Sequence, residues 1–362
     1  MMQQISHPVG GRVAARSAVV FRLGLIVAAL GAAALVLGTS SGCWSRSAEE
    51  VVVYAALDRE FSEPLLEEFQ QRSGVRVLPK YDVESTKTVG LVNALIQEQA
   101  RPRCDLFWNN EILHTVRLEK MGLLAPYRTD RAASFPPEYR SPQGTWYGFA
   151  ARARVLIVNT EIVAEPDRPR GIRDLTDPKW KGRVGIAKPL FGTTATHAAV
   201  LWSHWGDDEA RKFFLALKEN AQVLSGNKQV ALSVARGELA FGLTDTDDAI
   251  IERDGGRPVE IVYPDQEEGG LGALFIPNTL ALIKGGPNSQ AAQQLVDFLL
   301  SPEVEAKLAA GRSAQFPLNP AVAVPSRAGA PQPLRRMPVD FAAAAAAWDS
   351  AATFLRDTFS SP

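Results

Sequence analysis

The 362-residue sequence predicts an α/β fold made of two α/β lobes. Apolar, β-branched runs of strand length alternate with amphipathic helical stretches, the pattern of parallel strands covered by helices. This alternation occurs twice along the chain. The chain is also longer than one hydrophobic core usually organises, which favours two lobes.

The first 42 residues predict a secretory signal peptide. Arg12, Arg16 and Arg22 lie in a stretch without acidic residues, and the apolar run Leu23–Leu37 follows. This run is shorter than the roughly 20 apolar residues of a spanning helix, and small polar residues follow it, as in a cleaved leader. We therefore expect an exported protein that is periplasmic or exposed at the cell surface.

Cys43 directly follows small residues and predicts a lipid attachment site. The segment resembles the lipobox of bacterial lipoproteins, although Ser40 stands where a Leu is usual. Residues 43–50 would then be a lipidated tether to the membrane. The alternative is ordinary cleavage near Cys43, which leaves a free thiol.

Lobe 1 is expected over residues 51–150. Helix ends are marked by Gly74, by Arg101-Pro102 and by Gly122. The expected strands are 51–56, 75–78 and 104–108, and the expected helices are 61–72, a helix through 89–96, and 111–121.

Lobe 2 is expected over residues 151–270, with strands at 155–158, 184–187 and 239–243 and helices at 194–205 and 208–221. Residues 271–325 form a third segment with a strand at 274–283 and helices at 290–300 and 302–310. Residues 326–362 are expected to hold a Pro- and Ala-rich connector and a terminal helix at 339–359. This helix is expected to dock on one lobe.

Six short motifs resemble, in order and spacing, the type II periplasmic binding proteins. They are similar to the bacterial extracellular solute-binding family 1, which includes ferric-iron-binding and phosphonate-binding proteins of ABC importers. The motifs are Val53–Glu60, Asp105–Trp108, Lys120–Tyr127, Arg152–Val155, Asp174–Arg183 and Phe316–Pro320.

This resemblance implies two α/β lobes joined by hinge strands, with a ligand cleft that closes between them. The chain would cross between lobes near Phe149–Arg154 and return near Leu271–Leu274, so that the third segment rejoins lobe 1. It also implies a monomer that works with a membrane permease and an ATPase.

Composition and motifs argue against other functional classes. The formal net charge is −1, with no basic tract that would indicate nucleic-acid binding. The sequence has no nucleophile, phosphate-loop or metalloprotease motif in a suitable context, and Cys104 lies in a strand too apolar to favour a thiolate. We therefore expect a carrier and not an enzyme, with a hydrolase as the rival class.

The family's ferric proteins bind iron through a tyrosine pair, a histidine or tyrosine, and a carboxylate. Transferred by motif, the pair falls at Thr246 and Asp247, the histidine at Asp58, and the glutamate at Asn110. No phenolate occupies any of these positions, so the iron assignment does not transfer directly.

Two interpretations of the cleft remain open. Asp58, Asp245 and Asp247 are candidate ligands of a hard cation such as Fe³⁺ or Ca²⁺, because hard ions prefer oxygen donors; such an ion would be cargo, and no cofactor is required. Neighbouring carboxylates are Glu111 and Asp248.

In the second interpretation these carboxylates contact an ammonium or guanidinium group of an organic ligand, and amides of Asn109 and Asn110 complete the contacts. The simplest alternative is that the aspartates only complement a helix dipole.

Two further segments have the chemistry of anion sites. Ser85-Thr86 and Gly192-Thr193-Thr194 each precede or begin a helix, where backbone N–H groups and hydroxyls can bind an oxyanion. Ordinary N-capping is the alternative. Together with the carboxylates, these segments predict a metal-plus-anion or zwitterionic ligand such as an aminophosphonate, with Trp108 and Trp146 either walling the cleft or lying in the core.

Overall fold

The computed structural model describes residues 49–82 and 88–360, which belong to one compact unit beginning at Glu49. The predicted signal peptide and Cys43 lie outside the described residues, as do Ser85 and Thr86. Among the residues that are described, no helix has both the length and the apolar character needed to span a bilayer.

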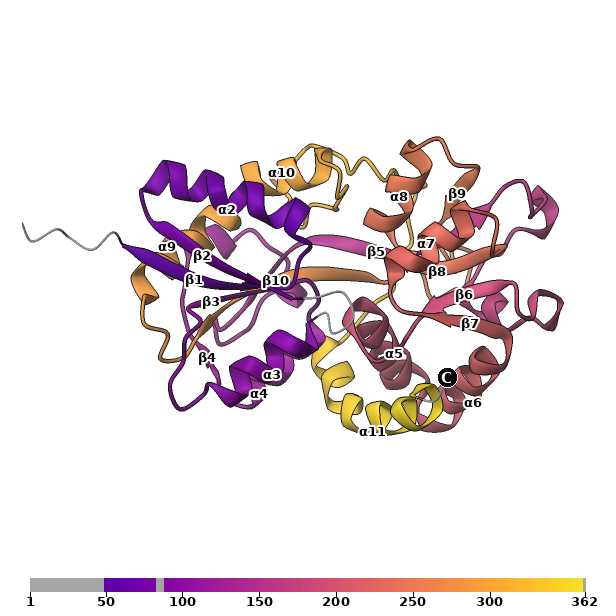
Figure 1. Cartoon of the computed structure of the whole chain (residues 1–362), viewed down its shortest axis with the longest axis horizontal. Coiled ribbons are helices and arrows are strands. Elements are labelled where there is room, and N and C mark those ends of the chain that lie inside the picture. Colours follow the sequence, from indigo (N-terminus) through magenta and orange to yellow (C-terminus); the bar gives the residue numbers. More distant parts are fainter. Residues whose placement is uncertain (1–48, 83–87, 361–362) are drawn as a thin grey trace, which may run out of the picture. The chain divides into compact units, whose positions relative to one another are not determined.

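The strands form one hydrogen-bonded path in the order β2, β1, β3, β10, β5, β8, β6, β7, with β4 paired to β10 and β9 to β5 (Figure 1). Their bounds are β1 Glu50–Ala55, β2 Arg76–Tyr81, β3 Leu106–Asn109, β4 Leu124–Ala125, β5 Tyr147–Asn159, β6 Val184–Ala187, β7 Ala221–Leu224, β8 Phe241–Asp245, β9 Val259–Val262 and β10 Phe275–Ile283.

The long strand β5 joins the two halves of this path. Its first half, up to Ala153, pairs with β10, and its second half, from Arg154, pairs with β8 and β9. We call the half with β1 to β4 and β10 lobe 1 and the half with β6 to β9 lobe 2. Each lobe holds parallel pairs, β1 with β2 and β3 in lobe 1 and β6 with β7 and β8 in lobe 2.

Helices cover the sheets on both faces because the strands are apolar on both faces. Successive residues of β1 show this: Val53 and Tyr54 lie in two different buried clusters. The helices of lobe 1 are α2 Arg59–Ser73, α3 Val89–Gln97, α4 Leu113–Lys120, α9 Ser289–Leu299 and α10 Pro302–Ala310. Helix α2 ends at Gly74, whose φ of 76° is the left-handed conformation that favours glycine.

The helices of lobe 2 are α5 Gly192–Trp205, α6 Asp207–Asn220, α7 Asn227–Ala235 and α8 Thr246–Asp254. Within residues 49–82 and 88–360, five short 3₁₀ helices occupy the loops of both lobes: Asp130–Ala132, Pro137–Tyr139, Glu165–Asp167, Ile172–Thr176 and Pro178–Trp180. The third segment returns to lobe 1, since β10 pairs with β3 and the first half of β5.

The terminal helix α11 Phe341–Phe359 differs from the expectation that it docks on one lobe. It packs against α4 of lobe 1 and against α5 and α6 of lobe 2 (Figure 1). Trp348 lies 6.2 Å from the His114 ring of α4, and Phe354 lies 5.4 Å from Trp202 of α5. Its aromatic anchors are spaced widely enough along 19 residues to reach both lobes.

Candidate ligand-binding site

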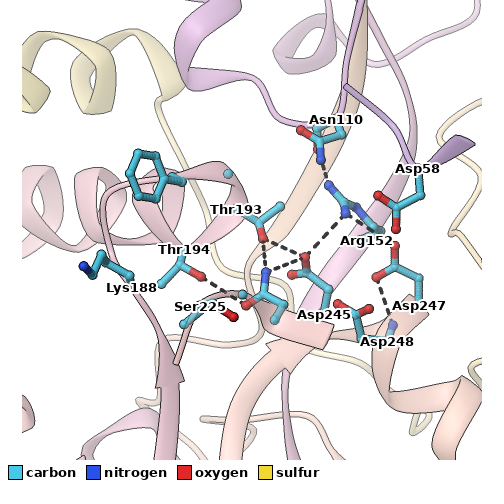
Figure 2. A pocket seen from close by; sticks show the side chains of 15 residues that line it. Asp58, Asn110, Arg152, Lys188, Thr193, Thr194, Ser225, Asp245, Asp247 and Asp248 are labelled. Atoms are coloured by element: carbon cyan, nitrogen blue, oxygen red, sulfur yellow. Dashed lines mark hydrogen bonds and ion pairs between the residues drawn. The ribbon is translucent and has the colours of Figure 1, made fainter. Parts of the chain in front are cut away.

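A small polar cavity lies where the two lobes meet. Its volume of about 30 Å³ is enough for more than one water-sized group. Lobe 1 contributes Asp58 after β1 and Asn110 after β3, and β5 contributes Arg152. Lobe 2 contributes the remaining lining residues, among them Lys188, Thr193, Thr194, Ser225, Asn227, Asp245, Asp247 and Asp248 (Figure 2).

The fold places these side chains together because most of them follow the carboxyl ends of parallel strands. Lys188 follows β6, Ser225 follows β7, and Asp245 is the last residue of β8. In open α/β sheets this edge is where ligands bind.

Asp245 is the centre of a buried ion network. Its Oδ1 lies 2.6 Å from Arg154 Nη1, and its Oδ2 lies 3.4 Å from Arg152 Nη1. Burial by itself would raise the pKa of Asp245, but Arg154 and Arg152 hold it below its usual range. Asp245 is therefore a carboxylate already neutralised by the protein's own cations.

Arg152 also contacts the next carboxylate and the wall of lobe 1. Its Nη1 lies 3.3 Å from Asp247 Oδ2, and its Nη2 donates to the backbone oxygen of Asn110. Arg152 Nε is buried without a hydrogen-bond partner among the described residues. This guanidinium thus joins both lobes at the cavity.

Hydroxyl and amide groups at the start of α5 form the other side of the cavity. Thr193 Oγ1 donates to Asp245 Oδ2 at 2.6 Å, and Asn227 Nδ2 donates to Thr193 Oγ1 at 2.8 Å. Thr194 Oγ1 donates to Asn227 Oδ1 at 3.1 Å. Because α5 begins at Gly192, its first backbone N–H groups lie here as well, and such a helix start favours an oxyanion.

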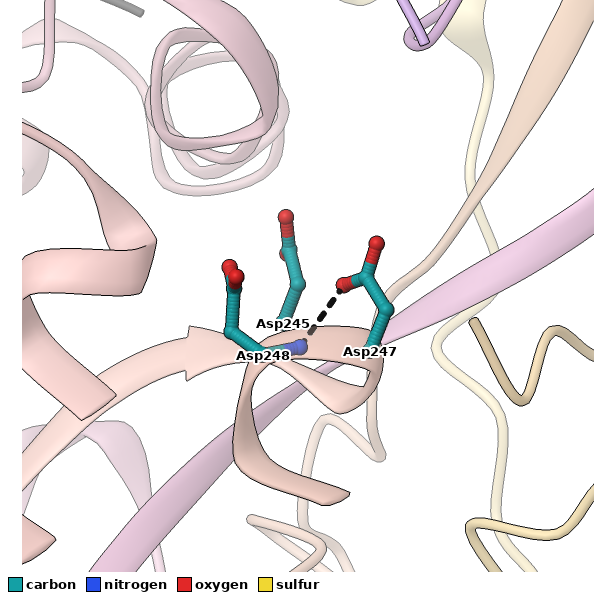
Figure 3. Close-up of side chains that lie close together, drawn as sticks. All are labelled: Asp245, Asp247 and Asp248. Carbon is teal, nitrogen blue, oxygen red and sulfur yellow. Dashed lines mark hydrogen bonds between the residues drawn. The ribbon is translucent and has the colours of Figure 1, made fainter. Parts of the chain in front are cut away.

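Three aspartates form a carboxylate cluster at the start of α8. One oxygen from each of Asp245, Asp247 and Asp248 lies within 4.8 Å of the others (Figure 3). All-oxygen donors suit a hard cation. However, Arg152 already lies against two of the three carboxylates, and no tyrosine is among the described residues that line the cavity.

The cavity brings together seven of the residues predicted to bind ligand: Asp58, Asn110, Gly192, Thr193, Thr194, Asp245 and Asp247. Asn109, Glu111 and Thr246 do not line it. Thr246 Oγ1 accepts from the backbone N–H of Ala153, and Asn109 Nδ2 donates to Glu111 and Thr115. Ser85 and Thr86 lie outside the described residues.

Sequence reasoning missed Arg152, Lys188, Ser225 and Asn227. Arg152 lies in a motif that carried the family resemblance, but nothing in the motif indicated that it faces the cleft. Ser225-Gly226-Asn227 joins a strand to a helix, and such a turn was not expected because neither element was predicted. Trp108 and Trp146 are buried and do not line the cavity.

Comparison with known proteins identifies the family. Residues 113–344 match the model of the bacterial extracellular solute-binding proteins. The chain belongs to this family. A curated relative, the major ferric iron-binding protein of Neisseria meningitidis, is 26% identical over 280 residues, which cover 75% of this chain and 82% of the relative. A putative 2-aminoethylphosphonate-binding periplasmic protein of Salmonella typhimurium is 25% identical over 279 residues, which cover 74% of this chain and 78% of that relative.

Solved structures of solute-binding proteins share the fold. Iron-bound HitA from Pseudomonas aeruginosa has a TM-score of 0.76 at 25% identity, and the match covers 86% of this chain and 99% of HitA. The periplasmic binding protein AfuA from Actinobacillus pleuropneumoniae, with fructose-6-phosphate bound, has a TM-score of 0.76 at 23% identity. The match covers 87% of this chain and 100% of AfuA. The chain therefore has the type II periplasmic binding fold, and its family and fold are those of transport proteins and not of enzymes.

Proposed function

We propose that this solute-binding protein captures, for an ABC importer, a small solute that carries an oxyanion at one end and an ammonium group at the other. An aminophosphonate is the simplest example. The protein would be exported by its signal peptide, held to the membrane through Cys43, and deliver its cargo to a permease and its ATPase.

The observation that carries this proposal is the two-sided chemistry of one small cavity. Arg152, Lys188 and the first backbone N–H groups of α5 offer positive charge and donors to an oxyanion. Asp58 and Asp248 line the same cavity and offer acceptors to a cationic group. The cavity is small in this arrangement of the lobes, which favours a compact cargo.

A hard cation such as Fe³⁺, bound with an oxyanion, is the second candidate. The carboxylate cluster favours it, and the names of several relatives refer to iron. Its main difficulty is Arg152, because a guanidinium 3.3 Å from Asp247 repels an adjacent cation. A second difficulty is that the described lining residues include no tyrosine, and so no phenolate.

A melting screen of the chelator-treated mature protein distinguishes the two candidates, because a ligand that binds only the folded state stabilises it by an amount that grows with the ratio of ligand concentration to dissociation constant. The probes are 2-aminoethylphosphonate, phosphate, Fe³⁺, Ca²⁺ and a polyamine. We expect 2-aminoethylphosphonate to raise the melting temperature with chelator present. Stabilisation by Fe³⁺ alone, with visible absorption, would reverse the assignment.

A further inference from the structure

The buried carboxylate of Glu111 connects lobe 1 to lobe 2 beside the cavity. Glu111 lies between β3 and α4 of lobe 1, and its Oε2 accepts a hydrogen bond of 2.7 Å from Thr196 Oγ1 in α5 of lobe 2. Both residues are fully buried. The bond therefore crosses the interface between the lobes in a place without bulk water.

The other partners of Glu111 all belong to lobe 1. Its Oε1 accepts from Asn109 Nδ2 at 2.9 Å and from the backbone N–H of His114 at 3.1 Å, and it lies 3.0 Å from the His114 ring. Burial by itself raises the pKa of Glu111, but His114 first, and then Thr196 and Asn109, hold this pKa below its usual range. Glu111 is thus a preorganised carboxylate on lobe 1 that offers its remaining oxygen to lobe 2.

Both ends of this hydrogen bond are close in sequence to the cavity walls. Asn110, which lines the cavity from lobe 1, is the residue before Glu111, and Thr193, which lines it from lobe 2, is three residues before Thr196 in α5. Residues three apart on a helix share one face. If the lobes separate at this point, the bond breaks and the cavity wall on lobe 1 moves away from the wall on lobe 2.

We propose that Glu111 is a positioning residue that latches α5 to lobe 1 and so stabilises the ligand-holding arrangement without touching the ligand. This rests on the proposed binding role but not on the identity of the cargo. A hydrogen bond to a charged group contributes enough that its loss is expected to weaken binding roughly tenfold. The effect should appear mainly in the dissociation rate, because the latch must break before the lobes separate and the ligand leaves.

The test removes the donor from lobe 2 and leaves lobe 1 untouched. Thr196→Val keeps the volume of the side chain and removes its hydroxyl, and Thr196→Ser restores the hydroxyl. Thr145→Val is the matched control, because the Thr145 hydroxyl bonds to a carboxylate, that of Glu119, and to Ser141 within lobe 1, and Thr145 does not line the cavity. Thr196→Ala serves if the valine variant does not fold.

Two measurements follow each variant. The first measures the distance between two spin labels in the ligand-free protein and so reports separation of the lobes. The labels are attached at Met121→Cys in lobe 1 and Leu215→Cys in lobe 2, because both side chains are about half exposed. The labelling uses a Cys43→Ser background. Stopped-flow binding of 2-aminoethylphosphonate reports the dissociation rate.

We expect Thr196→Val to lengthen or broaden the interlobe distances and to raise the dissociation rate about tenfold, while Thr196→Ser and Thr145→Val resemble the wild type. Unchanged distances in Thr196→Val would overturn the latch. If 2-aminoethylphosphonate does not bind the wild type, the proposed cargo fails, but the distances in the ligand-free protein still decide whether the latch exists.

Discussion

Replacement of Asp245 by alanine tests whether this carboxylate is an internal counter-ion. Asp245 is 1% exposed, and the Arg154 guanidinium that it neutralises at 2.6 Å is fully buried. Removing one partner of a buried ion pair leaves the other charge without compensation, which costs about 3–5 kcal/mol. Asp245→Ala should therefore lower the free energy of unfolding by about that amount.

Urea denaturation of the ligand-free protein, followed by circular dichroism, measures this change. The sign of the effect is decisive. If Asp245 were one of several mutually repelling carboxylates awaiting a metal ion, its removal would relieve repulsion and stabilise the ligand-free protein. Asp248→Ala is the matched control, because Asp248 belongs to the same cluster but is only partly buried, and it should cost less.

The same substitution should change the response to acid. The folded-state pKa of Asp245 is lowered, so its contribution is present above the unfolded value of about 4 and is lost as the pH falls through the folded value. The difference in stability between wild type and Asp245→Ala should therefore narrow below about pH 4. A gain in stability on substitution, or a constant difference down to pH 2, would refute the reasoning.

Two further substitutions test other parts of the structure. Burial, followed by Arg154, lowers the pKa of His197 to about 3, so the wild type should lose stability as the pH falls from about 6.5 towards 3. His197→Leu should reduce this loss, measured as the difference between urea midpoints at about pH 7 and about pH 4.5. An equal difference in wild type and variant would contradict the prediction. Trp348→Ala removes a buried ring of α11 that contacts lobe 1. This substitution should lower the free energy of unfolding by about 3–5 kcal/mol and make α11 susceptible to limited proteolysis. An unchanged denaturation midpoint would contradict this packing.

The strand and helix pattern was predictable where the residues were strongly apolar. Strand β6 at 184–187 and helix α10 at 302–310 have the bounds that the sequence predicted. Strand β7 was assigned partly to the preceding helix, and α7 and α8 were not delimited, because all three elements are short, with four residues in β7 and nine in each helix. Tertiary contacts with β6 and β8 stabilise these short elements.

The cavity was predictable in outline because aspartate and asparagine follow predicted strands at Asp58, Asn110 and Asp245. The ion network was not predictable, since it depends on the pairing of β5 with β8, which sets Arg154 opposite Asp245. Glu111 was expected in the cleft as the neighbour of Asn110. Its side chain instead contacts Thr196, and only the packing of α5 against lobe 1 determines that direction.

Calorimetric titration of the chelator-treated protein with 2-aminoethylphosphonate, ethylphosphonate and ethylamine tests the two-sided cavity most directly. The account predicts one site per chain for 2-aminoethylphosphonate and binding at least about 100-fold weaker for each half-molecule, because each leaves one side of the cavity without a partner of opposite charge. Equal binding of ethylphosphonate, or binding that requires Fe³⁺, would contradict the account.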